Sequence, residues 1–288
     1  REGPLGGQRR TRSDKRGGRM SVVLHLSDTH FGTERPAVVE ALVAMATRQR
    51  PDLVILSGDI TQRARPRQFR AARAFVDRLG APVLAIPGNH DIALFDLWAR
   101  LTRPYERFAE AFGGDLAPVH ASPDLLVIGV NTTRARRHRH GEVSPSQIEQ
   151  VARLLATADD RQLRVVVVHH PVAVPEAGER ANRLRGHEAA VRAWAAAGAD
   201  LVLGGHIHLP FVMPVQGLAR PLWVVQAGTA VSTRTRPGGP NSVNLLRWGE
   251  AAEDPARADG RPGCRIERWD YCDQEQAFRP AWDTVIRP

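Results

Sequence analysis

The sequence predicts an α/β fold built around parallel strands. Short apolar runs, typical of buried strands, alternate with segments whose apolar residues recur at helical spacing. The order of strand, helix, strand, helix and strand implies a parallel sheet with right-handed crossovers. Two successive halves of the chain show this pattern, so they could form two packed sheets. The chain has 288 residues, of which 42% are hydrophobic, and it can therefore bury a full core.

The first half predicts three strands and two helices, followed by a less regular segment. The regular elements are a strand at 21–26, a helix from about Pro36, a strand at 52–56, a helix from Pro66 to Gly80 and a strand at 82–87. From 94 to 112 the pattern is helical but is broken by Pro104. The residues expected to pack there are Trp98, Leu101, Tyr105 and Phe108.

The second half repeats the alternation and then changes to short strands. A strand at 124–130 leads into a loop at 132–140 that is too rich in Arg and His for the core. Ser144 is expected to cap a helix. The remaining elements are a strand at 163–168, a helix near 188–197, a strand at 200–203 and short strands at 211–215, 222–225, 241–248 and 264–271.

The net charge of +9 is concentrated at the N-terminus. Residues 1–19 contain seven basic and two acidic residues, a net charge of +5, which leaves +4 for all the others. This Gly- and Arg-rich segment has little apolar surface to bury. We therefore expect a disordered basic tail at 1–19, followed by one domain at 20–288. A tail that binds nucleic acid is an alternative that the charge distribution favours less.

The sequence also indicates where in the cell the protein is expected to act. No apolar run approaches the roughly 20 residues needed to cross a bilayer, and no apolar stretch follows the basic N-terminus as in a signal peptide. The two cysteines, Cys264 and Cys272, are too few for a disulfide framework or a thiolate metal cluster. We expect a cytoplasmic protein that does not act at a membrane.

Polar side chains directly follow five of the predicted strands, and they include five of the eleven histidines. The carboxyl ends of parallel strands meet at one edge of a sheet, where open α/β folds bind their ligands. Carboxylates, imidazoles and one amide, without a thiolate, suit Mn, Fe, Zn or Co. One ion needs only about four protein ligands, so seven ligands with a shared carboxylate match two ions. The polar residues at the strand ends are Asp28, His30, Asp59, Asn89, His90, His169, His206 and His208.

Five motifs built on these residues resemble the calcineurin-like metallophosphoesterase superfamily, and more closely its bacterial class III cyclic-nucleotide phosphodiesterase branch. Together the five motifs are highly specific, although each alone is weak. The resemblance covers roughly residues 21–248 and predicts a four-layer α/β/β/α sandwich of two mixed sheets flanked by helices. The motifs are Asp28-Thr29-His30, Gly58-Asp59, Gly88-Asn89-His90-Asp91, His169-His170-Pro171 and Gly205-His206-Ile207-His208.

The resemblance implies a role for each residue. His90 would be the general acid or a stabiliser of the transition state rather than a ligand, and Asp59 would bridge two divalent ions. Because two carboxylates face four positive charges, the site would attract a phosphoester and form metal-bound hydroxide as the nucleophile. The ligands implied are Asp28, His30 and His208 for one ion, and Asn89, His169 and His206 for the other.

We therefore expect hydrolysis of cyclic nucleotides or other small phosphodiesters. The residues expected to contact the substrate are Asn89, His90, His140 and Arg234. Solvated loop positions are the alternative for His140 and Arg234. His25, inside the first strand, is expected to be a hydrogen-bonded histidine of the core or near the site. The side chain of His170 is expected to point away from that of His169, because neighbouring residues of a strand alternate.

Two other functions remain open at this point. A nuclease that acts on DNA or RNA would use the same metals, with help from the basic tail. A non-catalytic metal-binding scaffold of the same fold is the second alternative. A protein phosphatase is disfavoured, because Ile60-Thr61-Gln62 follows Asp59 in place of an Asp-Arg-Gly motif. A homodimer is compatible with the family, although no particular interface is indicated.

Overall fold

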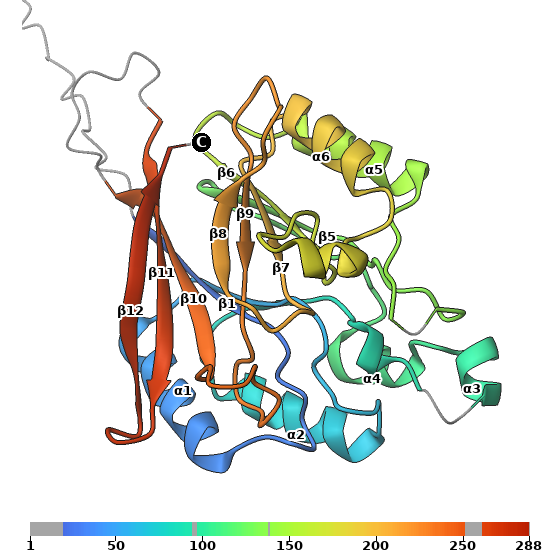
Figure 1. Cartoon of the computed structure of the whole chain (residues 1–288), viewed down its shortest axis with the longest axis vertical. Coiled ribbons are helices and arrows are strands. Elements are labelled where there is room, and N and C mark those ends of the chain that lie inside the picture. The colour runs from blue at the N-terminus through green and yellow to red at the C-terminus, as the bar shows by residue number, and fades with distance from the viewer. Residues whose placement is uncertain (1–19, 94–96, 138, 251–260, 288) are drawn as a thin grey trace, which may run out of the picture.

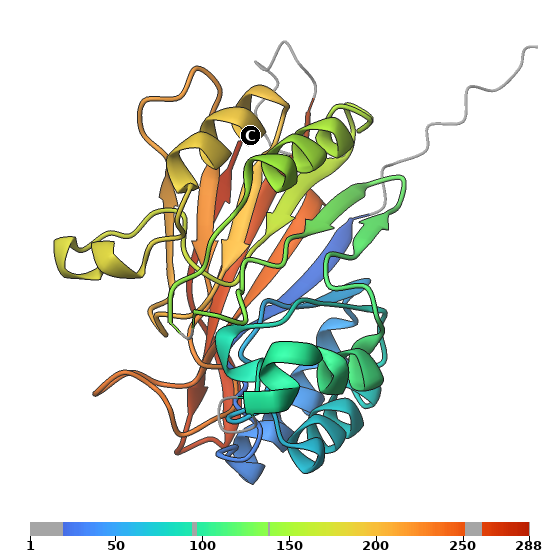
Figure 2. The same ribbon diagram turned by 90° about the vertical axis from the view of Figure 1, so that its right-hand side faces the viewer.

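Two mixed sheets pack face to face between two layers of helices. The computed structural model describes residues 20–93, 97–137, 139–250 and 261–287. Helices α1, α2 and α4 cover the outer face of one sheet, and α5 and α6 cover the outer face of the other (Figures 1 and 2). This is the four-layer arrangement that the sequence predicted. The expected tail at 1–19 lies outside the described residues.

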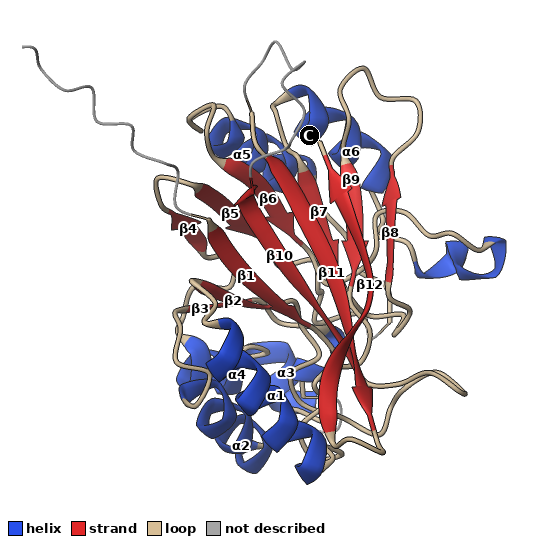
Figure 3. Cartoon of the chain, turned by 90° about the vertical axis from the view of Figure 1, so that its left-hand side faces the viewer, coloured by secondary structure: helices blue, strands red, loops and turns tan. Residues whose placement is uncertain are grey.

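The first sheet has the strand order β12-β11-β10-β1-β2-β3. Its three N-terminal strands are parallel, and the C-terminal strands extend it in antiparallel pairs beside β1 (Figure 3). The last strands of the chain therefore lie next to the first. The strands are β1 Ser21–Leu26, β2 Leu53–Leu56, β3 Val83–Ala85, β10 Ser242–Glu250, β11 Gly263–Cys272 and β12 Ala277–Ile286.

The second sheet has the order β4-β5-β6-β7-β9-β8. Its four central strands are parallel, and an antiparallel strand closes each edge. Parallel strands bring their carboxyl ends to the same edge, which is where the polar motifs follow. The strands are β4 Val119–Ala121, β5 Leu125–Gly129, β6 Leu163–Val167, β7 Leu201–Gly204, β8 Phe211–Pro214 and β9 Trp223–Gln226.

The helices begin at residues that suit a helix start. Proline occupies the first turn of α1, α2 and α5, where its missing N–H removes no helical hydrogen bond. Ser144 caps α5 as predicted, because its hydroxyl accepts a hydrogen bond from the Gln147 N–H at 3.2 Å. The helices are α1 Pro36–Gln49, α2 Pro66–Asp77, α3 Leu97–Thr102, α4 Glu106–Phe112, α5 Pro145–Leu155 and α6 His187–Ala196, with 3₁₀ helices η1 Asn89–Asp91 and η2 Ala177–Asn182.

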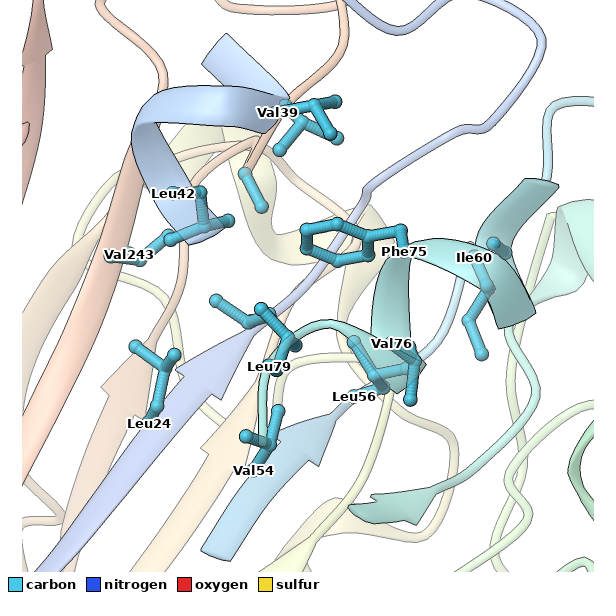
Figure 4. Packing of buried hydrophobic residues seen from close by; sticks show 14 of the residues in the cluster. Leu24, Val39, Leu42, Val54, Leu56, Ile60, Phe75, Val76, Leu79 and Val243 are labelled. Atoms are coloured by element: carbon cyan, nitrogen blue, oxygen red, sulfur yellow. The ribbon is translucent and has the colours of Figure 1, made fainter. Parts of the chain in front are cut away.

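Three apolar clusters fill the spaces between the four layers. One packs α1 and α2 against the first sheet, where Leu42 and Phe75 meet Leu24 and Leu56 (Figure 4). A second packs α5 and α6 against the second sheet, with Trp194 fully buried. The third lies between the sheets and contains residues from both. Both faces of each central strand are therefore buried, which explains their nearly continuous apolar sequences.

The segment at 94–112 differs from the prediction. Phe108 is buried, but Trp98 and Leu101 are 64% and 74% exposed, so the expectation that they pack in the core was wrong. They lie on α3, a helix of six residues at the periphery of the molecule (Figure 1). The Arg103 guanidinium lies 4.9 Å from the Trp98 ring and covers part of it.

Two edge strands, β4 and β12, were not predicted. β4 has three residues, and the ten residues of β12 include Pro280 opposite a register shift at Trp269. An edge strand tolerates proline because one side of it needs no ladder hydrogen bonds. None of the helices among the described residues combines the length and the apolar character needed to span a bilayer.

Asp200 connects the two sheets at the end opposite the polar motifs. Its carboxylate is fully buried immediately before β7 and accepts a hydrogen bond from the Arg164 N–H of β6 at 2.8 Å. It also pairs with Arg220, which precedes β9, and with Arg261, which precedes β11 of the other sheet, at 3.0 Å. A single buried carboxylate thus joins four segments of the sandwich.

We expect Asp200→Ala to lower the free energy of unfolding by about 3 kcal/mol, because removing one partner of a buried ion pair leaves the other charges uncompensated. Urea unfolding would measure the change. Asp160→Ala is the matched control, since Asp160 pairs with Arg164 at the surface and is 99% exposed; its effect should stay below about 1 kcal/mol. Equal effects of the two substitutions would contradict the structural role of Asp200.

Candidate metal centre and active site

Five strand ends bring the predicted polar residues together. The loop after β1 carries Asp28 and His30, and the turn after β2 carries Asp59. The residues contributed after β3, β6 and β7 are Asn89 and His90, His169, and His206 and His208. Contacts of 3.1 to 4.0 Å link Asp28, Asp59 and five of the other side chains across the two halves of the chain.

Many of these residues have an unusual backbone conformation. The φ angles of Asp28, His30, Asp59, His206 and His208 are 52°, 42°, 49°, 73° and 56°. This left-handed region is unfavourable for residues other than glycine, although Asn, Asp and His tolerate it better than most. The conformation turns the chain sharply out of each strand. Strained conformations of this kind gather at functional sites.

One group of side chains lies around Asp28. Its Oδ1 atom is 3.1 Å from His208 Nε2 and 3.7 Å from His30 Nε2, and the two imidazole nitrogens are 3.3 Å apart. Its Oδ2 atom accepts a hydrogen bond from the His206 N–H at 2.9 Å. The carboxylate therefore fixes the His206–His208 turn from the other half of the chain and faces both imidazoles.

Asp59 lies between that group and a second one. Its Oδ2 atom is 3.8 Å from His30 Nε2, and its Oδ1 atom is 3.3 Å from His169 Nε2. The His169 Nε2 atom is also 3.2 Å from Asn89 Oδ1. The two Asp59 oxygens therefore face opposite groups, as a carboxylate shared by two cations would.

Backbone carbonyl groups orient the histidine rings. The carbonyl oxygens of Ser57 and Gln62 each accept a hydrogen bond from a ring Nδ1, that of His169 at 2.8 Å and that of His90 at 2.9 Å. The Nδ1 of His208 donates in the same way to the carbonyl of Arg234. Each bond places the proton on Nδ1, so Nε2 is the nitrogen that could bind a cation or exchange a proton. No side-chain signal in the sequence marks these carbonyl partners.

Asp91 organises the turn behind the site. Its carboxylate accepts hydrogen bonds from the N–H groups of Ile60, Thr61 and Gly88 at 2.7 to 3.0 Å. The Thr61 hydroxyl adds a fourth bond at 2.8 Å. Asp91 thus ties the turn after β2 to the turn after β3.

Electrostatic interactions keep the two central carboxylates ionised. Burial alone would raise the pKa of Asp28, but His208 and His30 hold that pKa well below its usual range. Burial acts in the same direction on Asp59, but His169, His90 and His30 together outweigh it, so the pKa of Asp59 is also well below the ordinary value. Burial and the charge of Asp59 raise the pKa of Asp91 to about 6. Asp28 and Asp59, which face the imidazoles, therefore stay ionised at a lower pH than Asp91 does.

The donor set fits divalent metal ions. The ligand atoms of Asp28, His30 and His208 lie within 4.8 Å of one another, and so do those of Asp28, Asp59 and His169. Asp28 Oδ1 is buried and has no hydrogen-bond partner, which is costly for a carboxylate oxygen. Carboxylate, imidazole and amide donors suit first-row divalent ions. These residues are thus placed to bind metal.

His170 differs from its prediction. Its ring lies 4.5 Å from the His206 ring and 4.9 Å from the His169 ring, so the expectation that it points away from His169 was wrong. The alternation rule fails because β6 ends at Val167 and the chain bends before His170. Its Nδ1 contacts Thr132 Oγ1 at 2.9 Å, while its buried Nε2 has no hydrogen-bond partner.

His25 agrees with its prediction as a hydrogen-bonded histidine. It is fully buried, and its two ring nitrogens contact Ser57 Oγ at 2.9 Å and Asn244 Nδ2 at 3.3 Å. Ser57 also supplies the carbonyl that orients His169. His25 therefore lies directly behind the potential metal ligands without joining them.

A cavity of about 500 Å³ lies next to the potential metal ligands and His90. Among the described residues that line it, Ile207 is the only apolar one. His140 is exposed and lies outside the lining, which includes its neighbour Arg139 instead; its role in substrate binding stays a prediction. His138, in the same loop, lies outside the described residues. The lining is formed by Asp59, Asn89, His90, Arg139, Glu179, Asn182, His206, Ile207, His208, Arg234 and Arg236.

Comparisons with known proteins agree with this geometry. A family model described as Calcineurin-like phosphoesterase matches residues 21–210. The chain is 30% identical over 207 residues to a cAMP/cGMP dual specificity phosphodiesterase of Mycobacterium tuberculosis, an alignment that covers 65% of this chain and 61% of that protein. It is 36% identical over 81 residues to the glycerophosphodiester phosphodiesterase GpdQ of Enterobacter lignolyticus, which covers 24% of this chain and 29% of that protein.

The chain thus spans less than two thirds of the length of these relatives. Among solved structures, it is similar to a dimetal phosphatase from Danio rerio, with a TM-score of 0.63 and 14% sequence identity. That alignment covers 92% of this chain and 98% of the other. At this identity the similarity concerns the fold.

We expect Gly88→Ala to displace Asp59. A Cβ atom at Gly88 would lie 2.1 Å from the Asp59 nitrogen and 2.3 Å from its Oδ1, and neither can yield without moving the turn. The free energy of unfolding should fall by about 1–3 kcal/mol, as measured by urea unfolding. Gly114→Ala is the control, because nothing lies within 4 Å of its added Cβ. A Gly88→Ala protein as stable as that control would contradict the tight packing.

Proposed function

This chain belongs to the calcineurin-like phosphoesterase family, and from that premise we propose that it is a metal-dependent phosphodiesterase of small phosphodiesters. The single observation that carries the proposal is the close approach of the seven potential ligands to one another beneath a polar cavity, which four of them and His90 line. Cyclic nucleotides are the leading substrate class, and glycerol-containing diesters are a related one. Relatives named for both activities support this choice.

Two ions would be divided between the two groups of side chains. Asp28, His30 and His208 would hold one ion, while Asn89, His169 and His206 would hold the other, with Asp59 shared. The ions would supply positive charge to the phosphate oxygens and lower the pKa of a water. The position of Asp59 between His30 and His169 supports the sharing. Mn, Fe, Zn and Co remain the candidates for the metals.

The residues of the chain would bind and orient the diester and move a proton. His90 Nδ1 donates to Gln62 O, so its Nε2 is the nitrogen that would exchange a proton with the departing alkoxide. Asn89, His90 and Arg234 line the cavity and would contact the phosphate. The cavity volume lies within the range of about 300–1,000 Å³ that is typical of small-molecule sites. This size favours a small diester over a protein or a nucleic acid. A homodimer and a cytoplasmic location stay predictions.

The test of this function is hydrolysis of a substrate panel with Mn²⁺ present. The panel comprises bis-p-nitrophenyl phosphate, p-nitrophenyl phosphate, 3′,5′-cyclic AMP, 2′,3′-cyclic AMP, glycerophosphoethanolamine and a short oligonucleotide. We expect turnover of at least one small diester well above that of the monoester. A preference for the oligonucleotide would favour a nuclease. No turnover by protein that holds two ions would favour the non-catalytic scaffold.

Two substitutions should separate metal binding from proton transfer. Asp59→Ala removes the shared ligand, so the protein should hold fewer than two ions per chain by mass spectrometry of the metal content. His90→Asn should keep both ions, while kcat should fall by about 10²–10⁴-fold because proton transfer is lost. Two tightly bound ions in the Asp59→Ala protein would contradict the bridging role. Unchanged kcat in the His90→Asn protein would remove His90 from the mechanism.

A further inference from the structure

Gln62 contacts two cavity residues through two different groups. Its backbone carbonyl accepts the hydrogen bond from His90 Nδ1 at 2.9 Å, and its side-chain Oε1 accepts one from Arg234 Nη1 at 3.1 Å. The Arg234 Nη1 atom lies 3.5 Å from His90 Nε2. Gln62 thus fixes both the imidazole and the guanidinium, and it places them beside each other.

The position of Gln62 is itself fixed. Its N–H donates to the Phe31 carbonyl at 3.0 Å. The preceding residue, Thr61, is buried and is bonded through its N–H and its hydroxyl to the Asp91 carboxylate. The following turn is closed by the bond from the Ala64 N–H to the Thr61 hydroxyl at 3.0 Å. The amide of Gln62 therefore extends from a rigid turn.

Arg234, in the other half of the chain, also makes contacts through both its backbone and its side chain. Its carbonyl oxygen accepts hydrogen bonds from His208 Nδ1 and from Thr229 Oγ1. Gln62 and Arg234 therefore each orient one histidine through the backbone, and their side chains are hydrogen-bonded to each other. This bridge joins the turn after β2 to the loop after β9.

The charges around Arg234 differ from those around its neighbour Arg236. Arg236 pairs with Glu179, which neutralises it, and its Nε donates to the Ile207 carbonyl at 2.9 Å. Within the part of the chain that the structure describes, no carboxylate lies within ion-pair distance of Arg234. Its partner Gln62 is neutral, so the guanidinium is held in place and keeps its full charge. A carboxylate at position 62 would also hold the Arg234 guanidinium in place, but it would neutralise the positive charge of that group.

We propose that Gln62 is a positioning residue that holds the Arg234 guanidinium beside His90 to bind a nonbridging oxygen of the phosphodiester. This inference rests on the proposed phosphodiesterase function and extends it to a residue that touches no reacting atom. A nonbridging oxygen is present in the ground state and the transition state alike. The bridge should therefore act mainly on KM, with a smaller effect on kcat.

The experiment uses the full chain loaded with Mn²⁺ and measures four quantities. They are the KM and kcat for bis-p-nitrophenyl phosphate, the Kd of inorganic phosphate by calorimetry, and the number of bound ions. Gln62→Ala should raise KM and the phosphate Kd by about tenfold, as expected for the loss of an aligned charged contact. Gln62→Glu should raise both further, because its carboxylate would neutralise Arg234. Both variants should keep two ions.

A double-mutant cycle distinguishes positioning from an independent contact. Arg234→Ala should raise KM at least as much as Gln62→Ala, and the double variant should match Arg234→Ala within about twofold, because residues that act through one contact are not additive. The matched control is Gln49→Ala. Gln49 accepts a hydrogen bond from Arg247 Nη2 at 2.6 Å, the same kind of pair outside the cavity lining, so its KM should equal that of the wild type.

Several outcomes would overturn the positioning role. These are multiplying effects in the double variant, a Gln62→Ala protein with wild-type KM and phosphate Kd, a Gln62→Glu protein that binds phosphate as well as the wild type, and loss of metal in Gln62→Ala. Failure of the proposed function looks different, because then the wild type itself does not turn over the diester. In that case the phosphate Kd values of the same variants still decide the role of Gln62.

Discussion

Two ionised carboxylates are buried at the seam between the sheets, and the surrounding loops are arranged to satisfy them. Asp28 and Asp59 come from the first sheet, and their oxygens face histidines delivered by the second. An isolated buried carboxylate is strongly disfavoured unless it is paired and hydrogen-bonded. The N–H groups of His206 and His90 meet this need by donating to Asp28 and Asp59 at 2.9 and 2.8 Å. The seam is therefore held by the same groups that make the site chemically active.

The groups that orient the site residues are mostly uncharged. Directly behind the ligands lie backbone carbonyls and neutral side chains such as Ser57 and His25, which orient the rings without adding charge. The ion pair of Glu179 with Arg236 lies in the cavity lining, and the ionic group around Asp200 lies at the opposite end of the strands. The histidine rings are thus oriented mainly by groups that add no charge, so the charge balance of the site is set by its carboxylates, by the arginines of the cavity and by any ions that bind there.

Sequence patterns predicted the central strands and the positions of the site residues, because a buried strand and the polar turn after it leave a sharp change in composition. The Ser144 cap was predictable for a similar reason, since capping depends on one side chain. The edge strands left weaker signals. β12 contains Pro280, and β4 is only three residues long, so neither shows the apolar run of a central strand. Trp98 was misassigned because helical periodicity does not reveal whether a short helix meets the core.

The division of the site residues into ligands and acid came from the resemblance to a family, and the orienting contacts came from the structure. Every residue has a carbonyl group, so the bonds from His90 to Gln62 and from His208 to Arg234 have no signature in the sequence. The direction of His170 depended on where β6 ends, which differed by one residue from the predicted 163–168 run and removed the basis for alternation.

The left-handed backbone at five of the proposed ligands links conformation to evolutionary history. The left-handed region costs an L-residue roughly 1–2 kcal/mol of conformational free energy, and it costs glycine far less. The left-handed turns after β1, β2 and β7 are therefore occupied by Asp and His at the expense of stability. In a descendant released from selection for metal binding, glycine at these positions would remove this backbone cost, against the loss of the hydrogen bonds that Asp28 and Asp59 accept. Regaining the site would mean restoring the left-handed Asp and His residues one by one.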